Sequence, residues 1–173
     1  MKIFIWLMKI PGLAWPFFRV LLPIWNFVWS NLEAFCHLRK RGSAVKILRA
    51  LDVSADSAAL LEKWYNEREF VWRKDPLRGL LDYSSTPWVS VARNAGDCDD
   101  MMLMAEHVLK SKYDEGHRCY IYASDGRSHA IYLLRIDKTW FVMSNQHFMG
   151  SFQTMGLAIR RFFQDKTLWF YVI

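Results

Sequence analysis

One cysteine at the predicted start of a strongly apolar helix constrains this chain more than any other feature. It lies in the run Gly96-Asp97-Cys98-Asp99-Asp100, which leads into an apolar stretch over residues 101–109. Glycine permits a tight entry, Asp97 is a favourable N-cap residue, and Asp100 stands where the second residue of a capping box would stand. The pattern therefore predicts a helix that begins at Cys98.

A thiol at this position lies near unpaired backbone N–H groups and the positive end of the helix dipole, which favours the thiolate. The neighbouring carboxylates of Asp97, Asp99 and Asp100 have the opposite effect, because their charges raise the pKa of a thiol. A nearby imidazolium or a bound cation would offset them. The alternative is that Cys98 is a small buried residue at a helix start, as most lone cysteines are.

Composition limits the kinds of protein that this chain can be. A chain of 173 residues with 53% hydrophobic content can form one domain with a core plus an appendage. Cys36, Cys98 and Cys119 show no metal-type spacing, which argues against a disulfide framework and a structural zinc site and favours a reducing compartment. The net charge of +6 suits an anionic partner, but no nucleic-acid-binding module is recognisable, so no nucleic acid is predicted as a partner.

The N-terminal part of the chain differs sharply from the rest. Residues 1–36 are dominated by apolar and aromatic side chains, and the basic run His37-Leu38-Arg39-Lys40-Arg41 follows. The uncharged run 20–32 is too short to cross roughly 30 Å of hydrocarbon, and a longer span from residue 10 would include Arg19 and two further prolines.

We therefore predict an apolar arm over residues 1–41 and a globular domain over residues 42–173. The tryptophans suit the headgroup region of a membrane, and the basic run suits an anionic cytoplasmic leaflet. The arm either spans a membrane or lies on it, with the domain on the cytoplasmic side, or it packs against a hydrophobic protein partner.

The order of elements in the domain indicates an α+β fold. Residues 42–75 read as helical, with one helix over 54–70, and residues 77–96 read as an extended connection. Strands are predicted over residues 119–123, 129–136, 139–144 and 168–173, with a helix over 153–163. Helices followed by a mainly antiparallel sheet are typical of the α+β class.

A histidine and a polar pair follow the cysteine in an order that suits thiol catalysis. The thiol must lose its proton to an imidazole, and a hydrogen-bond acceptor must hold that imidazole in one tautomer. His129 opens the second predicted strand and is our candidate base, while Ser144 and Asn145 end the third. His107, His117 and His147 compete with His129, and a surface role for His129 also remains open.

Three ordered segments resemble the transglutaminase-like cysteine peptidases, particularly their bacterial branch. Asp82-Tyr83-Ser84-Ser85-Thr86-Pro87 is similar to the family's Asp-Tyr-Trp-x-Thr-Pro, Gly96-Asp97-Cys98-Asp99-Asp100 to its Gly-Asp-Cys-Glu-Asp, and His129-Ala130-Ile131 to its His-x-Val. The resemblance covers about half of the chain. It implies a papain-like α+β fold with a central cysteine-bearing helix against an antiparallel sheet, and a Cys-His-Asp site.

The third site residue departs from the family pattern. The family's Val-Leu-Asp-Asn corresponds to Val142-Met143-Ser144-Asn145, so the alignment selects Ser144. Strand alternation lets only one of Ser144 and Asn145 point toward His129. An amide oxygen is the better acceptor for an imidazole N–H, and a strand end can bulge to present it, so we predict Asn145 as the orienting residue.

The resemblance implies acyl transfer at a protein or peptide substrate. Cys98 would attack an amide carbonyl, with its own N–H and Trp88 as oxyanion donors. In some bacterial members acidic residues beside the cysteine bind calcium, and Asp97 and Asp99 match those positions, although helix capping explains them without a metal. The predicted function is a membrane-associated cysteine hydrolase that requires no cofactor. A catalytically inactive binding or structural protein, assembled through its apolar arm, and an amine acyltransferase remain alternatives.

Overall fold

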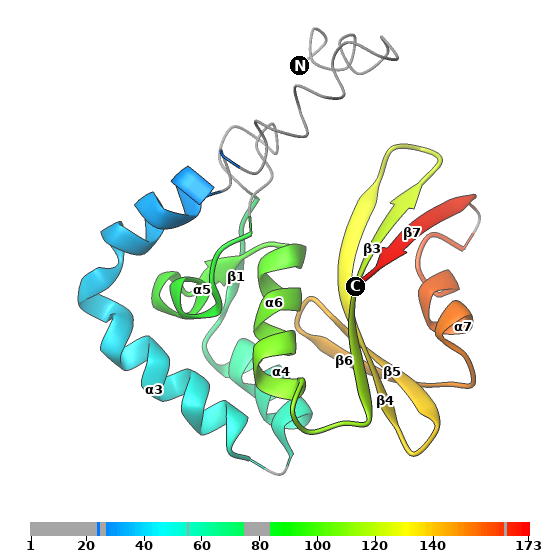
Figure 1. Cartoon of the computed structure of the whole chain (residues 1–173), viewed down its shortest axis with the longest axis horizontal. Coiled ribbons are helices and arrows are strands. Elements are labelled where there is room, and N and C mark those ends of the chain that lie inside the picture. Colours follow the sequence, from blue (N-terminus) through cyan, green and yellow to red (C-terminus); the bar gives the residue numbers. More distant parts are fainter. Residues whose placement is uncertain (1–23, 25–26, 55, 75–83, 165) are drawn as a thin grey trace, which may run out of the picture.

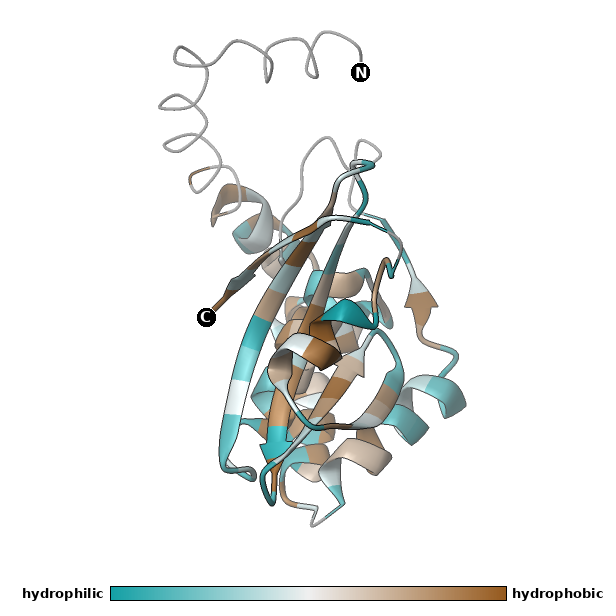
Figure 2. Ribbon diagram, turned by 90° about the vertical axis from the view of Figure 1, so that its right-hand side faces the viewer, coloured by the Kyte–Doolittle hydropathy of each residue, from teal (hydrophilic) through white to brown (hydrophobic). Residues whose placement is uncertain are grey.

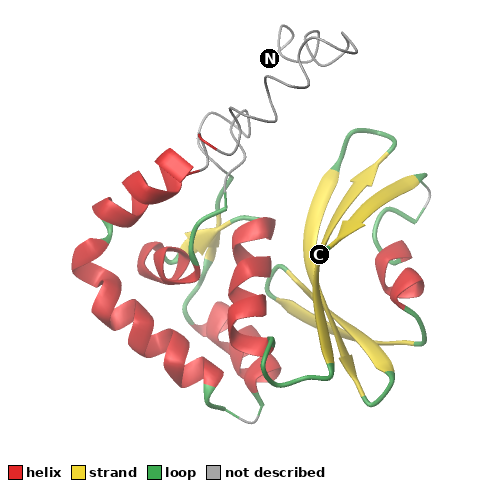
Figure 3. Cartoon of the chain, in the orientation of Figure 1, coloured by secondary structure: helices red, strands yellow, loops and turns green. Residues whose placement is uncertain are grey.

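The computed structural model describes residues 24, 27–54, 56–74, 84–164 and 166–173 of the chain. Its centre is a five-stranded antiparallel sheet, with α6 and the other N-terminal helices on one side and α7 on the other (Figure 1). Figure 3 shows the helices gathered on one side of the sheet and α7 on the other; all described helices except α7 precede the sheet along the chain. The predicted α+β class, with a cysteine-bearing helix against an antiparallel sheet, is confirmed.

The sheet is built mainly from hairpins between neighbouring strands. Its strands are β3 (Glu115–Ala123), β4 (Ser128–Ile136), β5 (Thr139–Ser144), β6 (His147–Phe152) and β7 (Leu168–Val172). They are arranged in the order β6-β5-β4-β3-β7 and every pair is antiparallel. The last strand therefore returns to pair with β3 and forms one edge of the sheet.

The helical layer covers one face of this sheet. It comprises a helical stretch over residues 27–36, the 3-10 helix η1 (Leu38–Lys40), α3 (Arg41–Asp52), α4 (Ser57–Glu67), α5 (Pro87–Arg93) and α6 (Cys98–Leu109). A short parallel pair, β1 (Val71–Trp72) and β2 (Ala95–Gly96), joins the end of α4 to the entry of α6. On the other face lies α7 (Met155–Arg160).

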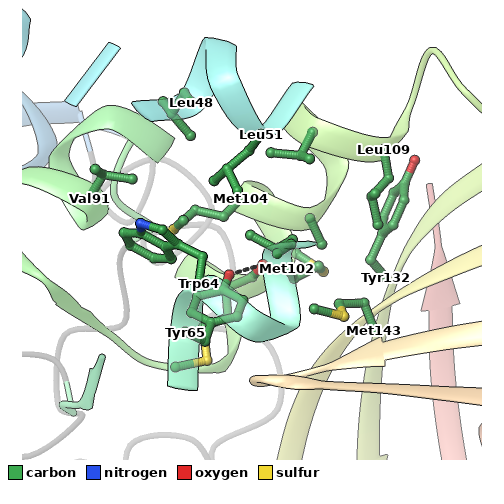
Figure 4. Close-up of a cluster of buried hydrophobic side chains, with 14 of the residues drawn as sticks. Leu48, Leu51, Trp64, Tyr65, Val91, Met102, Met104, Leu109, Tyr132 and Met143 are labelled. Carbon is green, nitrogen blue, oxygen red and sulfur yellow. Dashed lines mark hydrogen bonds between the residues drawn. The ribbon is translucent and has the colours of Figure 1, made fainter. Parts of the chain in front are cut away.

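Two apolar clusters hold these layers together. The first lies between the helices and the sheet and includes Met102 and Met104 of α6 together with Tyr132 of β4 (Figure 4). The second lies between the sheet and α7 and includes Ile131 and Leu133. The alternation along β4 explains this division, because successive strand residues point to opposite faces. Figure 2 shows the apolar residues concentrated along the central strands.

Three parts of the predicted secondary structure are wrong. Residues 71–72, within the stretch predicted as helical, form the strand β1. Residues 87–93, predicted as extended, form α5, because Pro87 occupies the first helical turn, where its missing N–H costs nothing, and Val89 and Val91 are buried. The strand β6 was not predicted. It follows β5 through a tight turn in which Asn145 adopts a left-handed conformation (φ 51°), a conformation that asparagine tolerates better than most residues.

The predicted boundary at residue 41 is crossed by several hydrogen bonds. Glu33 binds Ser85 and Arg93, and the Lys40 ammonium donates to the Ala92 carbonyl at 3.3 Å. Residues 27–41 are thus attached to the domain, whereas the part of the predicted arm over residues 1–23 lies outside the described residues. None of the helices within the described ranges has the length and apolar content needed to cross a membrane.

Candidate active site

Cys98 is the first residue of α6, as the sequence predicts. The chain enters the helix through Asp97, whose backbone is extended (φ −106°, ψ −161°). Gly96 is required just before it, because a Cβ atom there would lie 2.7 Å from the Asp100 Cβ atom. The predicted capping box is wrong, since the Asp97 side chain makes no capping hydrogen bond. The Asp100 carboxylate instead accepts a hydrogen bond from the Ser85 N–H.

Asp100 belongs to a largely buried ring of four residues, which joins the helical stretch 27–36 and residues 85–93 to α6. It accepts hydrogen bonds from the Ser85 N–H at 2.6 Å and from Arg93 Nη2 at 2.5 Å. Arg93 also pairs with Glu33, and the Ser85 hydroxyl donates to Glu33 at 2.7 Å, which closes the ring. Burial, followed by the charge of Asp99, raises the pKa of Asp100 to about 7, although Arg93 and Ser85 act against this rise.

The first two segments of the family resemblance meet at this ring. Ser84 donates a hydrogen bond to Asp99, and the next residue, Ser85, binds Asp100. Asp82 and Tyr83 of the same segment lie outside the described residues. The acidic residues that follow Cys98 thus hold the preceding loop against the start of α6.

His129 and Ser144 form the second half of the candidate site. His129 Nε2 lies 2.8 Å from Ser144 Oγ, and the hydroxyl is buried. The ring of Phe162 covers the imidazole, with 5.3 Å between the ring centroids. Burial lowers the pKa of His129 below its usual 6.5, so the imidazole is neutral near pH 7 and able to accept a proton.

Our choice of Asn145 as the partner of His129 is wrong for this contact. The aligned residue, Ser144, makes it, and Asn145 lies in the β5–β6 turn instead. β5 continues regularly up to Ser144, so Ser144 lies on the same face of the sheet as Val142 and points toward His129. That one of these two residues orients His129 during a reaction stays a prediction.

The start of α6 and the start of β4 lie at the same end of the sheet. Tyr120 of β3 pairs with Ala130, the neighbour of His129, and burial together with the charge of Asp99 raises the pKa of Tyr120. His129, however, shares its sheet face with Ile131 on the α7 side. Cys98 packs against the cluster on the helical side, so the two side chains lie on opposite faces of the sheet. The imidazole would have to move over the end of the sheet to meet the thiol, and this pair stays a prediction.

The other candidate residues lie elsewhere. His107 is exposed near the end of α6, His117 lies 2.7 Å from Glu115, and His147 lies 3.7 Å from Glu62. None of these contacts involves the start of α6. Trp88 lies in the first turn of α5, and the guanidinium carbon of Arg41 lies 5.6 Å from the centre of the Trp88 ring. The role of Trp88 as an oxyanion donor stays a prediction.

Sequence reasoning missed the residues that support the site. Arg93, Glu33 and Phe162 were not singled out, because nothing local marks a residue whose partner is distant in the sequence, as Glu33 is from Ser85 and Arg93 and Phe162 from His129. One signal was available for Arg93. A single cation just before the acidic run at residues 97–100 is the natural partner of a buried carboxylate.

A pH dependence of stability follows from the buried imidazole. Because the pKa of His129 is lowered in the folded state, the unfolded chain binds more protons between that pKa and 6.5. The contribution of His129 to the free energy of unfolding should therefore fall as the pH drops below about 6.5, whereas protonation of Asp100, whose pKa is raised in the folded state, acts in the opposite direction. Urea unfolding of the wild type and of His129→Gln across this range measures the effect, which should be smaller in the variant.

Comparisons with known proteins give structural neighbours only. No protein-family description and no curated protein matches the sequence. The fold is similar to calcium-bound LapG of Legionella pneumophila, with 15% identity and a TM-score of 0.46 over 69% of this chain and 75% of that chain. It is also similar to EGTA-treated LapG of that organism, with 16% identity and a TM-score of 0.46 over 69% and 73% of the two chains.

Proposed function

We propose that this chain is a transglutaminase-like cysteine hydrolase that acts on amide bonds of a protein or peptide. The observations that support it are the position of the Cys98 thiol at the start of α6 and the His129–Ser144 hydrogen bond near the same end of the sheet. The imidazole lies on the opposite face of the sheet from Cys98, so the reaction requires His129 to move round the end of the sheet. Backbone N–H groups at a helix start favour the thiolate. A partly buried, neutral imidazole is suited to remove the thiol proton.

The proposed reaction proceeds through an acyl-enzyme. His129 takes the thiol proton, the Cys98 sulfur attacks the carbonyl carbon, and the imidazolium returns the proton to the leaving amine. Water then hydrolyses the thioester. The Cys98 N–H and Trp88 would stabilise the oxyanion. Ser144 can hold the imidazole by donating or accepting, but it supplies no negative charge to stabilise the imidazolium.

Calcium fits beside the nucleophile as an accessory ion. Carboxylate oxygens of Asp97, Asp99 and Asp100 lie within 4.8 Å of one another. Because Asp100 already binds Arg93 and Ser85, Asp97 and Asp99 would hold the ion. Its charge would offset the acidic residues that oppose ionisation of the Cys98 thiol.

We also propose that the protein acts at a membrane, with the domain on the cytoplasmic side. The apolar run within residues 1–36 and the basic run over residues 37–41 support this placement. A second candidate function is that of a catalytically inactive binding protein with the same fold. The serine at position 144, where the family has a carboxylate, favours it, and an amine in place of water would make the chain an acyltransferase.

Substitution of Ser144 tests the hydrolase proposal. Ser144→Asp should restore a carboxylate beside His129, raise the pKa of the imidazole and increase the rate of Cys98 acylation by an activated ester by roughly tenfold or more. Ser144→Ala should lower that rate, and Asn145→Ala serves as the matched control and should have little effect. If Asn145→Ala is the more damaging change, Asn145 is the orienting residue. If Ser144→Ala and Asn145→Ala both leave the rate of Cys98 acylation unchanged, the binding-protein function is favoured over the hydrolase.

A further inference from the structure

The helical stretch over residues 27–36 exposes its apolar side. Its outward apolar residues, with the neighbouring Ile24 and Leu38, form a surface that we name the outer face: Ile24, Phe27, Val28, Leu32, Phe35 and Leu38. One polar residue, Asn31, is exposed among them. Phe27 is 71% exposed and Phe35 is 72% exposed. A surface helix normally turns such residues toward the core, so this orientation is the reverse of the usual one.

Buried polar contacts fix this orientation. Glu33, on the inward side of the helix, binds Ser85 and pairs with Arg93 in the buried ring. Rotating the helix to bury Phe27 and Phe35 would withdraw the Glu33 carboxylate from Arg93 and leave buried charges without their partners, which is strongly unfavourable. The domain therefore holds the apolar residues outward.

The exposed charges along this stretch of the chain are all positive. Within residues 24 and 27–41, as described, the only acidic residue is Glu33, and it is turned inward. Arg39, Lys40 and Arg41 follow the outer face directly and are exposed. An apolar strip that ends in a cationic cluster complements a surface with an apolar interior and anionic headgroups, which is an anionic bilayer leaflet.

We propose that the outer face docks on the surface of an anionic membrane, with the apolar side chains inserted among the headgroups and Arg39 and Arg41 against lipid phosphates. This docking requires no step of the hydrolase reaction. It places the start of α6 a short distance from the membrane, because Glu33 joins the docking helix to Arg93 and hence to Asp100. A substrate for Cys98 would then be a protein segment close to the membrane.

Labelling of Cys36 tests the docking in the full chain. Cys36 is exposed in the docking helix and Cys119 is buried, so Cys98→Ser leaves Cys36 as the accessible thiol. An environment-sensitive dye on Cys36 should shift to the blue with vesicles of phosphatidylcholine and phosphatidylserine, and not with phosphatidylcholine alone. The same dye on Val53→Cys, in a chain with Cys36→Ser and Cys98→Ser, should not shift, since position 53 lies at the far end of α3.

Matched substitutions identify the surface. Phe27→Glu with Leu32→Glu should weaken vesicle binding by roughly tenfold or more, because two apolar side chains are lost from the bilayer. Trp169→Glu with Phe170→Glu, on the exposed edge strand β7, should leave it unchanged. Arg39→Gln should weaken binding to the phosphatidylserine vesicles by about fivefold. Equal thermal transitions of the variants show that the fold is retained.

Three results would overturn this proposal. The first is an unshifted dye with the anionic vesicles. The second is a shift without vesicles that grows with protein concentration, because a second copy would then cover the outer face. The third is a vesicle-induced shift that survives Phe27→Glu with Leu32→Glu, because residues 1–23 would then carry the binding.

Discussion

Arg93→Ala should lower the free energy of unfolding by about 3–5 kcal/mol. Arg93 is the only cation in the ring that it forms with Glu33, Asp100 and Ser85. Its removal would leave the carboxylates of Glu33 and Asp100 buried without a counter-charge, and the pKa of Asp100, already raised to about 7, would rise further. Urea unfolding at neutral pH measures the loss.

Two further variants control this experiment. Lys63→Ala removes a cation from an exposed pair with Glu67 and should change stability little, since such pairs contribute less than about 1 kcal/mol. Arg93→Met combined with Glu33→Gln and Asp100→Asn removes all three charges and should recover part of the loss. An unfolding free energy for Arg93→Ala within error of the wild type would show that the ring does not stabilise the fold.

Deletion of residues 1–41 should lower the midpoint of thermal unfolding by roughly 6–12 °C relative to deletion of residues 1–26. The longer deletion removes Glu33, and with it the contact of Arg93 to the helical stretch 27–36. It also removes the hydrogen bond from Lys40 to the Ala92 carbonyl and the cation–π contact of Arg41 with the Trp88 ring. Both truncated chains can be compared by circular dichroism.

A full-length Glu33→Gln variant separates the ring from the rest of the deleted segment. It keeps residues 27–41 but removes one charge, and it should cost about 1.5–3 kcal/mol, the range for a hydrogen bond to a charged group. Equal midpoints for the two truncated chains would instead place the domain boundary at residue 41, where the sequence alone places it.

The local elements of the fold were readable from the sequence. α6 begins at Cys98 because its turn residues and apolar run lie next to each other, and β3, β4 and β5 were found because alternation and turns are also local signals. β6 was missed because His147–Phe152 is mostly half-exposed and contains Gly150. Its pairing with β5 depends on the tight turn at Asn145.

The site was predicted least well where it depends on distant contacts. The alternation rule correctly indicated that only one of Ser144 and Asn145 can face His129, but acceptor strength selected the wrong one for the contact. Asn145 does not make this contact, because it adopts the left-handed conformation of the β5–β6 turn. Glu33 was assigned to a separate arm because no local pattern reveals a partner such as Arg93, 60 positions away.

The rate at which Cys98 reacts with iodoacetamide near neutral pH tests the central claim most directly. Cys36 is exposed and serves as the internal reference, while burial raises the pKa of Cys119 to about 12 and makes it unreactive. Cys98 should react roughly tenfold faster than Cys36 or more, and His129→Asn should remove most of that advantage. A rate for Cys98 equal to or below that of Cys36, unchanged by His129→Asn, would contradict the cysteine hydrolase.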